Sequence, residues 1–336
     1  MTEKKDNPLI LAIESSCDDT AAALIRNGKM LANIIAGQKI HEQYGGVIPE
    51  LASRAHQQNI LPVVNQALKI ANVTLENINA IAYTQGPGLM GSLLVGSQFA
   101  KGLSLALDIP TIGINHLQAH VAALYLGNPL PQFPYLCLLV SGGHTQIIKV
   151  TNYLEMEIIG STIDDAAGEA FDKAAKMLKL PYPGGPLIDK NAELGNPIKF
   201  TFPMAKVSGY DYSFSGLKTS LLYFLQKNVK ETPNFIEENM NDICASLRYN
   251  IVTILLKNLE RAAKDLNISH LGLAGGVSAN MLLRKELQNL GEKNNWHTYI
   301  PAFEYCTDNA AMIAIAGHYK YLNAEFSTLE EVPFAR

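Results

Sequence analysis

One stretch near the N-terminus decides the fold: LILAIESSCDDT, residues 9–20. An apolar run long enough for one buried strand ends there in a short polar turn. A second apolar run follows at residues 21–25, then the hairpin dipeptide Asn27-Gly28, then a third run that ends at Ile34-Ile35. Asn-Gly between two apolar runs is a strong signal for a β-hairpin. Residues 9–35 therefore predict three consecutive antiparallel strands.

The same pattern occurs a second time, farther along the chain. Residues 135–140 form an apolar run that ends at Ser141-Gly142-Gly143-His144, and residues 145–150 and 155–159 supply two more strands. Each copy then continues with a strand, a glycine-rich loop and a helix, and with one more strand that leads into a further helix. These later elements lie at 80–83, 85–91 and 110–115 in the first copy and at 270–273, 274–276 and 297–301 in the second.

The repetition predicts two similar α/β lobes that face each other across a central cleft. Ligands of such folds bind where loops leave the carboxyl ends of the strands. We expect lobe one to cover residues 9–115 and to be completed by a C-terminal helix at 309–325. Lobe two is expected at 116–308 with a helical insertion around 160–230, and residues 1–8 are expected to be disordered.

Composition agrees with two domains and restricts the partners. The chain has 336 residues, of which 48% are apolar, enough for two hydrophobic cores. It shows no signal peptide and no apolar run of membrane-spanning length, so we expect a cytoplasmic protein. The four cysteines show no C-x-x-C spacing and are read as reduced thiols. A net charge of −4 means that a nucleic acid would need a local basic patch or other subunits. Lys39, Arg54, Lys173 and Lys176 are candidates for local contacts.

The glycine loops of the second copy indicate a nucleotide site. Glycine lets backbone N–H groups approach an anion, and a helix N-terminus adds a favourable partial charge. Ser141-Gly142-Gly143 occupies a hairpin turn, Gly275-Gly276 lies between a strand and a helix, and Asn280 begins that helix. The alternative is that these glycines only make tight turns. Two such loops at matched places in a duplicated fold favour nucleotide binding.

His116 and His120 indicate a metal site. Residues four apart share one face of a helix, so both imidazoles can reach one cation. The matching place in the second copy holds Asp308, which would bridge the cleft from the other lobe. Two imidazoles and one carboxylate suit iron(II) or zinc, although such a histidine pair often only packs or caps. A metalloprotease is a weak alternative, because Leu117 stands where such an enzyme needs a glutamate.

Several acids add candidates whose roles spacing does not separate. Asp18 and Asp19 lie in the first hairpin turn. Asp165, Glu169 and Asp172 share a helix face, and Asp164 is expected to cap that helix. Lys218 follows a serine-rich loop that is either structural or a phosphate contact.

These motifs together carry a family resemblance over almost the whole chain. The sequence resembles the catalytic subunits of the tRNA N6-adenosine threonylcarbamoyltransferase family, once described as sialoglycoprotein endopeptidases. The matching stretches are IESSCDDT (13–20), YGGVIPELASR (44–54), GPGL (86–89), HLQAH (116–120), LVSGGHT (139–145), DDAAGEA (164–170), FSGLKT (214–219) and AGGVSAN (274–280). Asp19 departs from the family, which usually has glutamate there.

The resemblance implies a fold and a reaction. The fold would be that of the actin-like ATPases (Hsp70, actin and sugar kinases), with two duplicated ribonuclease-H-like lobes. The reaction would transfer the threonylcarbamoyl group from threonylcarbamoyl-adenylate to N6 of the adenosine immediately 3′ of the anticodon, in tRNAs that read codons beginning with adenine. The products would be N6-threonylcarbamoyladenosine and AMP.

The resemblance also implies site residues. His116, His120 and Asp308 would hold one Fe²⁺ per subunit, with Zn²⁺ as the alternative, and Asp18 is our candidate for the base. ATP or ADP would also fit the nucleotide site. The residues expected to bind the adenylate are Leu139, Val140, Ser141, Gly142, Gly143, Asp172, Gly185, Asp189 and Asn280.

The family works with partners in bacteria, which the resemblance extends to this chain. They are tRNA, an inactive actin-like paralogue that forms a heterodimer, a small P-loop ATPase and a separate synthase that makes the adenylate. The main alternative function is an actin-like sugar kinase, which needs no pair of histidines facing an aspartate. A non-catalytic scaffold would be expected to lose these three ligands.

Overall fold

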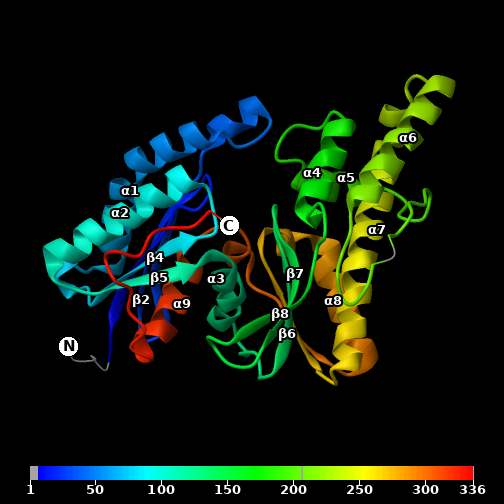
Figure 1. The fold of residues 1–336 in the computed structure, drawn as a ribbon. Coiled ribbons are helices and arrows are strands. Elements are labelled where there is room, and N and C mark those ends of the chain that lie inside the picture. Colours follow the sequence, from blue (N-terminus) through cyan, green and yellow to red (C-terminus); the bar gives the residue numbers. More distant parts are fainter. Residues whose placement is uncertain (1–6, 206, 336) are drawn as a thin grey trace. The chain divides into compact units, whose positions relative to one another are not determined.

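Two compact units make up the chain in the computed structural model (Figure 1). Unit 1 comprises Met1–Leu130 and Pro301–Arg336, and unit 2 comprises Pro131–Ile300. The structure describes residues 7–205 and 207–335. Most of the segment predicted to be disordered, residues 1–8, therefore lies outside the described residues.

Unit 1 contains a five-stranded mixed sheet. Its strands are β1 (Leu9–Glu14), β2 (Thr20–Arg26), β3 (Lys29–Ala36), β4 (Ala80–Gly86) and β5 (Thr111–Asn115). They lie in the order β3-β2-β1-β4-β5, with β1, β2 and β3 antiparallel and β4 and β5 parallel to β1. Strand β1 is buried along its whole length because it lies in the middle of the sheet with helices on both faces.

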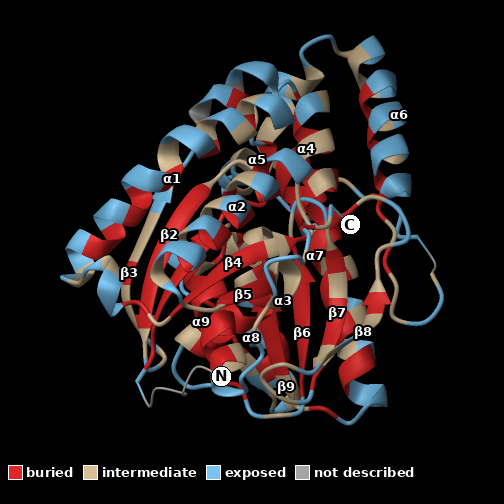
Figure 2. Ribbon diagram, turned by 60° about the vertical axis from the view of Figure 1, so that its left-hand side comes forward, coloured by how far each residue is buried: buried red, intermediate tan, exposed pale blue. Residues whose placement is uncertain are grey.

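Unit 2 repeats this sheet. Its strands are β6 (Tyr135–Val140), β7 (Thr145–Val150), β8 (Met156–Ser161), β9 (His270–Ala274) and β10 (His297–Tyr299). The order β10-β9-β6-β7-β8 has the same pattern of antiparallel and parallel neighbours as unit 1. The predicted duplication is therefore confirmed strand by strand, and Figure 2 draws the central strands of each sheet as buried.

Helices cover both faces of the sheet in unit 1. The elements are α1 (Pro49–Ala71), α2 (Met90–Leu107), α3 (His116–Ala122) and α9 (Ala310–Leu322), with short 3₁₀ turns at Lys39–Tyr44, Leu75–Asn77, Ala123–Leu126 and Phe303–Tyr305. α1 packs on β2 and β3 and α2 packs on β4, whereas α9 packs on β1 and β2 from the other face. α9 is apolar on nearly every side because it also packs against α3.

Unit 2 carries a larger helical layer. Its helices are α4 (Ala167–Met177), α5 (Gly184–Ala192), α6 (Ser215–Glu231), α7 (Phe235–Asp265) and α8 (Met281–Asn294), and a 3₁₀ turn at Gly276–Ala279 precedes α8. α6 buries only Leu217, Leu221 and Leu225, which lie four residues apart on one face, and its other faces are largely exposed (Figure 2). Among the described residues, no helix is long and apolar enough to cross a membrane.

The borders of the units correct the predicted lobes. Residues 116–130 and 301–308, which were expected in lobe two, belong to unit 1. The reason is packing, because α3 and the following 3₁₀ turn lie against α9. Asp308 therefore belongs to the same unit as His116 and His120, and the prediction that it comes from the other lobe is wrong.

The C-terminal segment is fastened to unit 1 by hydrogen bonds. Ser327 N donates to Thr111 O at 2.8 Å, and Phe334 N donates to Gln85 O at 3.1 Å, so the segment runs beside β5 and β4 (Figure 1). The buried ammonium group of Lys101 on α2 donates to Leu329 O at 2.8 Å and to Glu331 O. Lys101 therefore replaces the donors that a paired strand would supply to these carbonyl groups.

We expect Lys101→Met to loosen this segment. The substitution keeps the apolar stem of the side chain but leaves two carbonyl oxygens without their donor, which costs about 1–3 kcal/mol. Denaturant unfolding should show the lower free energy of unfolding, and limited proteolysis should cut the C-terminal segment faster than in the wild type. The matched control is Lys69→Met, at an exposed lysine of α1. Equal stability and equal proteolysis of the two variants would contradict the role of Lys101.

Candidate functional site

The ends of three parallel strands bring a group of polar side chains together in unit 1. β1 ends at Glu14, β4 contains Thr84, and β5 ends at Asn115, directly before His116. The Asn115 carboxamide oxygen accepts from Leu117 N at 2.9 Å and Gln118 N at 3.1 Å, which caps α3. This cap places the first turn of α3, with His116 and His120 on one face, at the carboxyl edge of the sheet.

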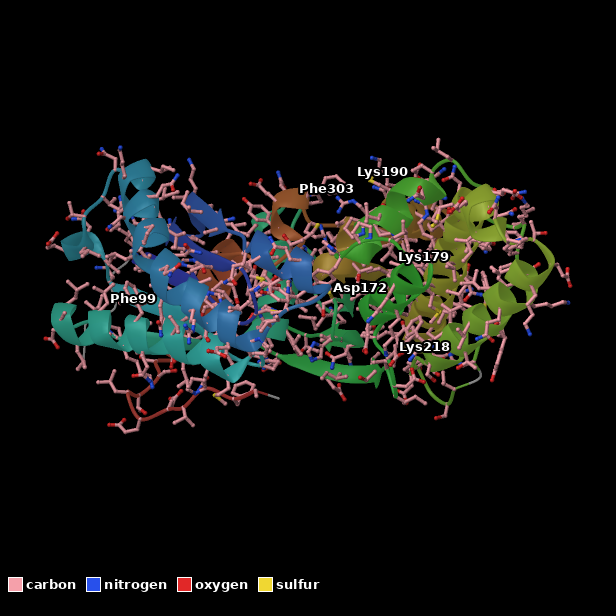
Figure 3. All side chains as sticks on the ribbon, turned by 90° about the horizontal axis from the view of Figure 1, so that it is seen from above. Phe99, Asp172, Lys179, Lys190, Lys218 and Phe303 are labelled. Atoms are coloured by element: carbon pink, nitrogen blue, oxygen red, sulfur yellow. The ribbon has the colours of Figure 1, made fainter. Side chains whose placement is uncertain are left out.

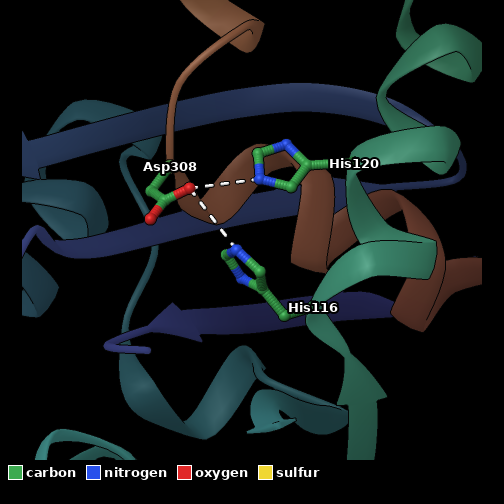
Figure 4. A group of neighbouring side chains, drawn as sticks. All are labelled: His116, His120 and Asp308. Atoms are coloured by element: carbon green, nitrogen blue, oxygen red, sulfur yellow. Dashed lines mark hydrogen bonds and ion pairs between the residues drawn. The ribbon is translucent and has the colours of Figure 1, made fainter. Parts of the chain in front are cut away.

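His116, His120 and Asp308 form one cluster (Figure 4). Asp308 Oδ1 lies 3.5 Å from His116 Nε2 and 3.1 Å from His120 Nε2. The two imidazole rings meet edge to face, with their centroids 4.7 Å apart. One ligand atom from each residue lies within 4.8 Å of the others. The structure thus brings together all three residues that were predicted as metal ligands.

Two carboxylates change the pKa of His116. Burial lowers this pKa, but the negative charges of Asp308 and Glu14 raise it, and the net result is a pKa of about 9. Burial raises the pKa of Asp308, whereas the charge of His116 and the hydrogen bond with His120 lower it. The lowering effects are larger together, and the resulting pKa is about 2. At neutral pH the metal-free cluster therefore pairs an imidazolium with an ionised Asp308.

The donor set and the distances from Asp308 fit a transition metal. Nitrogen and oxygen ligands at about 2.1 Å from a metal lie roughly 3–3.5 Å from each other, and the Asp308 distances of 3.5 and 3.1 Å match this spacing. Two imidazoles with one carboxylate are typical ligands of iron(II) and zinc centres that keep coordination positions open.

Asp18 and Asp19 lie in the turn between β1 and β2, close to this cluster. Burial and the negative charges of Asp18, Asp308 and Glu14 raise the pKa of Asp19 to about 7. The pKa of the neighbouring Cys17 thiol is raised by burial and by Asp18, so this thiol stays protonated. A general base works best when its pKa lies near the operating pH. Asp19 therefore becomes a second candidate for the base beside Asp18.

The residues predicted to bind the nucleotide lie in unit 2. The glycines of this unit's loops differ in whether the protein has space for a side chain there. Ser141 N donates to His144 O at 2.8 Å and closes the turn after Leu139 and Val140, which are buried at the end of β6. A Cβ atom added to Gly142, Gly143 or Gly276 would meet no atom of the protein within 4 Å. The protein itself therefore leaves free space beside these three glycines.

Gly275 has a structural reason to be glycine. Its φ of +86° belongs to the left-handed region, and a Cβ atom there would lie 2.4 Å from Val140 O. Gly275 therefore allows the loop after β9 to pass close to the end of β6, whereas the adjacent Gly276 is open. Substitutions at Gly275 and at Gly276 should therefore have different effects, which an experiment can distinguish.

Asp172 and Gly185 meet at the start of α5. The Asp172 Oδ1 atom accepts from Gly184 N at 2.9 Å and from Gly185 N at 3.1 Å. Burial raises the pKa of Asp172 in net, although these two hydrogen bonds oppose the shift. Asp172 therefore orders the α5 N-terminus through one of its two carboxylate oxygens.

Asp189 and Asn280 hold each other at the start of α8. Asn280 Nδ2 donates to Asp189 Oδ1 at 2.8 Å, while Asn280 Oδ1 caps α8 by accepting from Leu283 N at 3.0 Å. Arg248, which is nearly buried on α7, donates to Asp189 Oδ1 at 2.8 Å and to Glu193. Sequence patterns did not indicate Arg248 as a site residue. It lies on a long helix with apolar periodicity and belongs to none of the glycine loops.

The other predicted acids have structural partners. Asp164 accepts from Phe214 N and from the hydroxyl groups of Ser213 and Ser215, so it caps α6 and not the helix that follows it in sequence. Asp165 and Glu169 both pair with Lys173 at 2.7 Å. Lys218 lies exposed on α6. Lys173 on α4 thus joins both of these carboxylates in one ion-pair network.

Solved structures of other proteins show the same fold. HypF from T. kodakarensis superposes with a TM-score of 0.64 over 99% of this chain and 50% of its own, at 14% identity. Component A of (R)-2-hydroxyglutaryl-CoA dehydratase from Acidaminococcus fermentans superposes with a TM-score of 0.53 over 94% of this chain and 99% of its own, at 14% identity. The chain is therefore an α/β protein of the actin-like ATPase fold, with a histidine–aspartate cluster in its first unit.

Sequence comparison identifies the family within this fold. The profile of the tRNA N6-adenosine threonylcarbamoyltransferases matches residues 29–315. The protein of that name from Christiangramia forsetii is 58% identical to this chain, over 97% of this chain and 96% of the relative. The one from Porphyromonas gingivalis is also 58% identical, over 99% of both chains. The chain belongs to the tRNA N6-adenosine threonylcarbamoyltransferase family and is a transferase. The resemblance seen in the motifs is thus confirmed, and the sugar-kinase and metalloprotease alternatives have no support.

We expect metal affinity at the cluster to rise with pH up to about 9. The metal must displace the proton of His116, whose pKa is about 9, so the dissociation constant should fall roughly tenfold per pH unit below that value and level off above it. Calorimetric titration of the metal-free protein with Co²⁺ between pH 6.5 and 10 measures this slope. His116→Ala/His120→Ala should abolish binding, while His297→Ala, an exposed histidine of unit 2, should leave it unchanged. A slope near zero would contradict the assignment.

We expect Gly276→Val to weaken nucleotide binding while the protein still folds. The new side chain points into open space in the free protein, so it should occupy the room that a phosphate or ribose needs. Calorimetry with ATP should show an affinity at least about tenfold lower. Gly275→Val is the contrasting variant, and it should unfold or lose more than about 2 kcal/mol because of backbone strain and the clash with Val140. Unchanged affinity of Gly276→Val for ATP would show that this loop does not contribute to nucleotide binding.

Proposed function

We propose that this transferase uses threonylcarbamoyl-adenylate as donor and binds one divalent metal ion. The proposed metal is iron(II), and zinc(II) is the alternative. The observation that carries the proposal is the cluster of His116, His120 and Asp308, with its metal-like spacing. A metal bound there would supply a Lewis acid for the carbamoyl carbonyl group. The acceptor is N6 of a tRNA adenosine, in agreement with the name of the family, and we propose the adenosine immediately 3′ of the anticodon.

The bonds that change define what the protein has to supply. The adenosine N6 forms a bond to the carbamoyl carbon, the bond from this carbon to the phosphate oxygen breaks, and AMP leaves with that electron pair. The amine loses one proton, so a base is needed. The turn with Asp18 and Asp19 is our candidate for this base. The pKa of Asp19, near 7, supports Asp19 over the originally predicted Asp18.

Unit 2 contributes the adenylate site in this proposal. The open glycines Gly142, Gly143 and Gly276 would let backbone N–H groups approach the phosphate. The ordered pairs Asp172 with Gly185 and Asp189 with Asn280 would contact the ribose or base from the starts of α5 and α8. ATP or ADP would fit the same residues, since they share the adenosine and the first phosphate.

Basic residues of unit 2 support contact with tRNA. Within the described residues, Lys176, Lys179, Lys190 and Lys218 are exposed and have no acidic partner, and Figure 3 labels the last three of them. Of the earlier candidates, Arg54 pairs with Glu50 and Lys173 with two acids, and the side chain of Lys39 lies outside the described part. Because the chain has 27 basic and 31 acidic residues, these few cations would give only weak binding.

We therefore propose that the chain acts with partner proteins in the cytoplasm. The partners are the inactive actin-like paralogue, a small P-loop ATPase and the synthase that makes the adenylate. They would supply the positive surface and the donor that this chain lacks.

A reconstituted reaction tests the proposed function. The full chain, loaded with Fe²⁺ under anaerobic conditions, is incubated with tRNA, threonine, bicarbonate, ATP and the three partner proteins, and nucleosides are analysed by mass spectrometry. The modified adenosine should appear with the full set, fall when the paralogue or the ATPase is omitted, and disappear with Asp308→Ala. No product with the full set, or equal product from Asp308→Ala, would overturn the proposal.

Two variants identify the base in this reaction. We expect Asp19→Asn to slow single-turnover transfer by roughly 10²–10⁴-fold, the usual contribution of a general base, and Asp18→Asn to slow it less. The wild-type rate should rise with pH through about 7, because Asp19 acts as a base only when it is ionised and its pKa is about 7. A larger loss of rate in Asp18→Asn than in Asp19→Asn would assign the general base to Asp18. Full activity of both variants would show that the base does not lie in this turn.

A further inference from the structure

Glu14 lies beside the cluster but is not one of the three predicted metal ligands. It is the last residue of β1, its side chain has no exposed surface, and it contacts three polar groups of the surrounding segments. Its Oε1 atom accepts from Ser16 N at 2.5 Å, and its Oε2 atom accepts from Thr84 Oγ1 at 2.6 Å. The third contact is His116 Nδ1, at 3.2 Å from Oε2. A buried carboxylate is costly unless such donors satisfy it.

The hydrogen bonds of Glu14 assign the tautomer of His116. An ionised carboxylate only accepts hydrogen bonds, and the donors Ser16 N and Thr84 Oγ1 favour the ionised form. The Nδ1 atom of His116 must then carry its hydrogen and direct it to Glu14, with Ser16 Oγ also 3.1 Å away. The unprotonated lone pair of the neutral ring is left on Nε2, the nitrogen that lies 3.5 Å from Asp308 Oδ1. This is the nitrogen that a metal needs.

The second histidine lacks a comparable contact. His120 Nε2 faces Asp308 at 3.1 Å, but its buried Nδ1 atom has no hydrogen-bond partner among the described residues. Only one of the two imidazoles is therefore oriented from behind by a carboxylate. A residue that merely filled space at the end of β1 would have no reason to be charged, and a threonine or glutamine would cost less to bury.

We propose that Glu14 is a positioning residue for the metal centre, which holds the His116 ring in the tautomer and orientation that present Nε2 to the cation. The proposal rests on the metal site of the proposed function. A carboxylate behind a ligating histidine fixes the ring and raises its basicity, and its loss usually weakens metal binding by roughly 10–100-fold. Glu14 acts through His116 and touches neither the donor nor the tRNA in this proposal.

Glu14→Gln tests the proposal, because it preserves size and removes the charge. We expect the purified variant to bind Co²⁺ roughly 10–100-fold more weakly than the wild type. The visible absorption bands of bound Co²⁺ should also change, because the orientation of one imidazole ligand changes. The matched control is Ser15→Ala, which removes the buried hydrogen bond from Ser15 Oγ to Ser92 O at 3.0 Å in the same turn and leaves Glu14 in place. This control should lose stability but keep wild-type affinity and wild-type absorption.

The outcomes separate this inference from the proposed function. Co²⁺ binding equal to wild type in Glu14→Gln, with the same absorption bands, would overturn the role of Glu14 while the metal site stands. A loss in Ser15→Ala as large as in Glu14→Gln would also overturn it, since any loosening of the turn would then suffice. A wild type that binds no Co²⁺ would overturn the metal site itself. If Glu14→Gln does not fold, Glu14→Asp, whose shorter carboxylate cannot reach His116 to the same extent, replaces it and should show the same weaker binding.

Discussion

The hydrogen bonds to the buried carboxylate of Glu14 are the interaction on which the first unit depends. β1 lies in the centre of its sheet and is buried on both faces, so every residue up to Ile13 is apolar. The strand then ends in a charge with no exposed surface, which is stable only because β4 and the turn provide Thr84 and Ser16 as donors. The same carboxylate reaches His116 at the end of β5. One anion thereby ties the ends of three neighbouring parallel strands to the cluster of possible ligands.

The two units share one strand order but carry different groups at the ends of their strands. In unit 1 the strand ends carry carboxylates and imidazoles, which suit a cation. In unit 2, the turn after β6 and the loop after β9 carry glycines, of which Gly142, Gly143 and Gly276 have open space beside them. Exposed backbone N–H groups and helix starts suit an anion such as a phosphate. The two units thus share a strand order but differ in the groups at their strand ends.

Much of this arrangement was predictable from local patterns. Apolar runs with turn residues between them predicted the duplicated strands, and the i, i+4 spacing predicted that His116 and His120 share a face. The border between the units was not predictable, because α3 packs on α9 through contacts between residues about 200 positions apart, which leave no local signal. The partners of Asp164, Asp189 and Glu14 were missed for the same reason. Each acid bonds to groups that are distant in sequence, namely the start of α6, Arg248 on α7 and His116 on α3.

The sequence by itself determined the duplicated α/β fold, the family and the residue types that can hold a metal or approach a nucleotide, because periodicity and glycine placement act over a few residues. Tertiary structure alone decided which of these residues work together. It joined Asp308 to the histidines within one unit, and it set the pKa of Asp19 near 7 through burial and three neighbouring carboxylates. It also separated a glycine that the backbone requires, Gly275, from one that leaves room for a ligand, Gly276. Burial, charge and free space are properties of residues brought together by folding, so they exist only once the chain is folded.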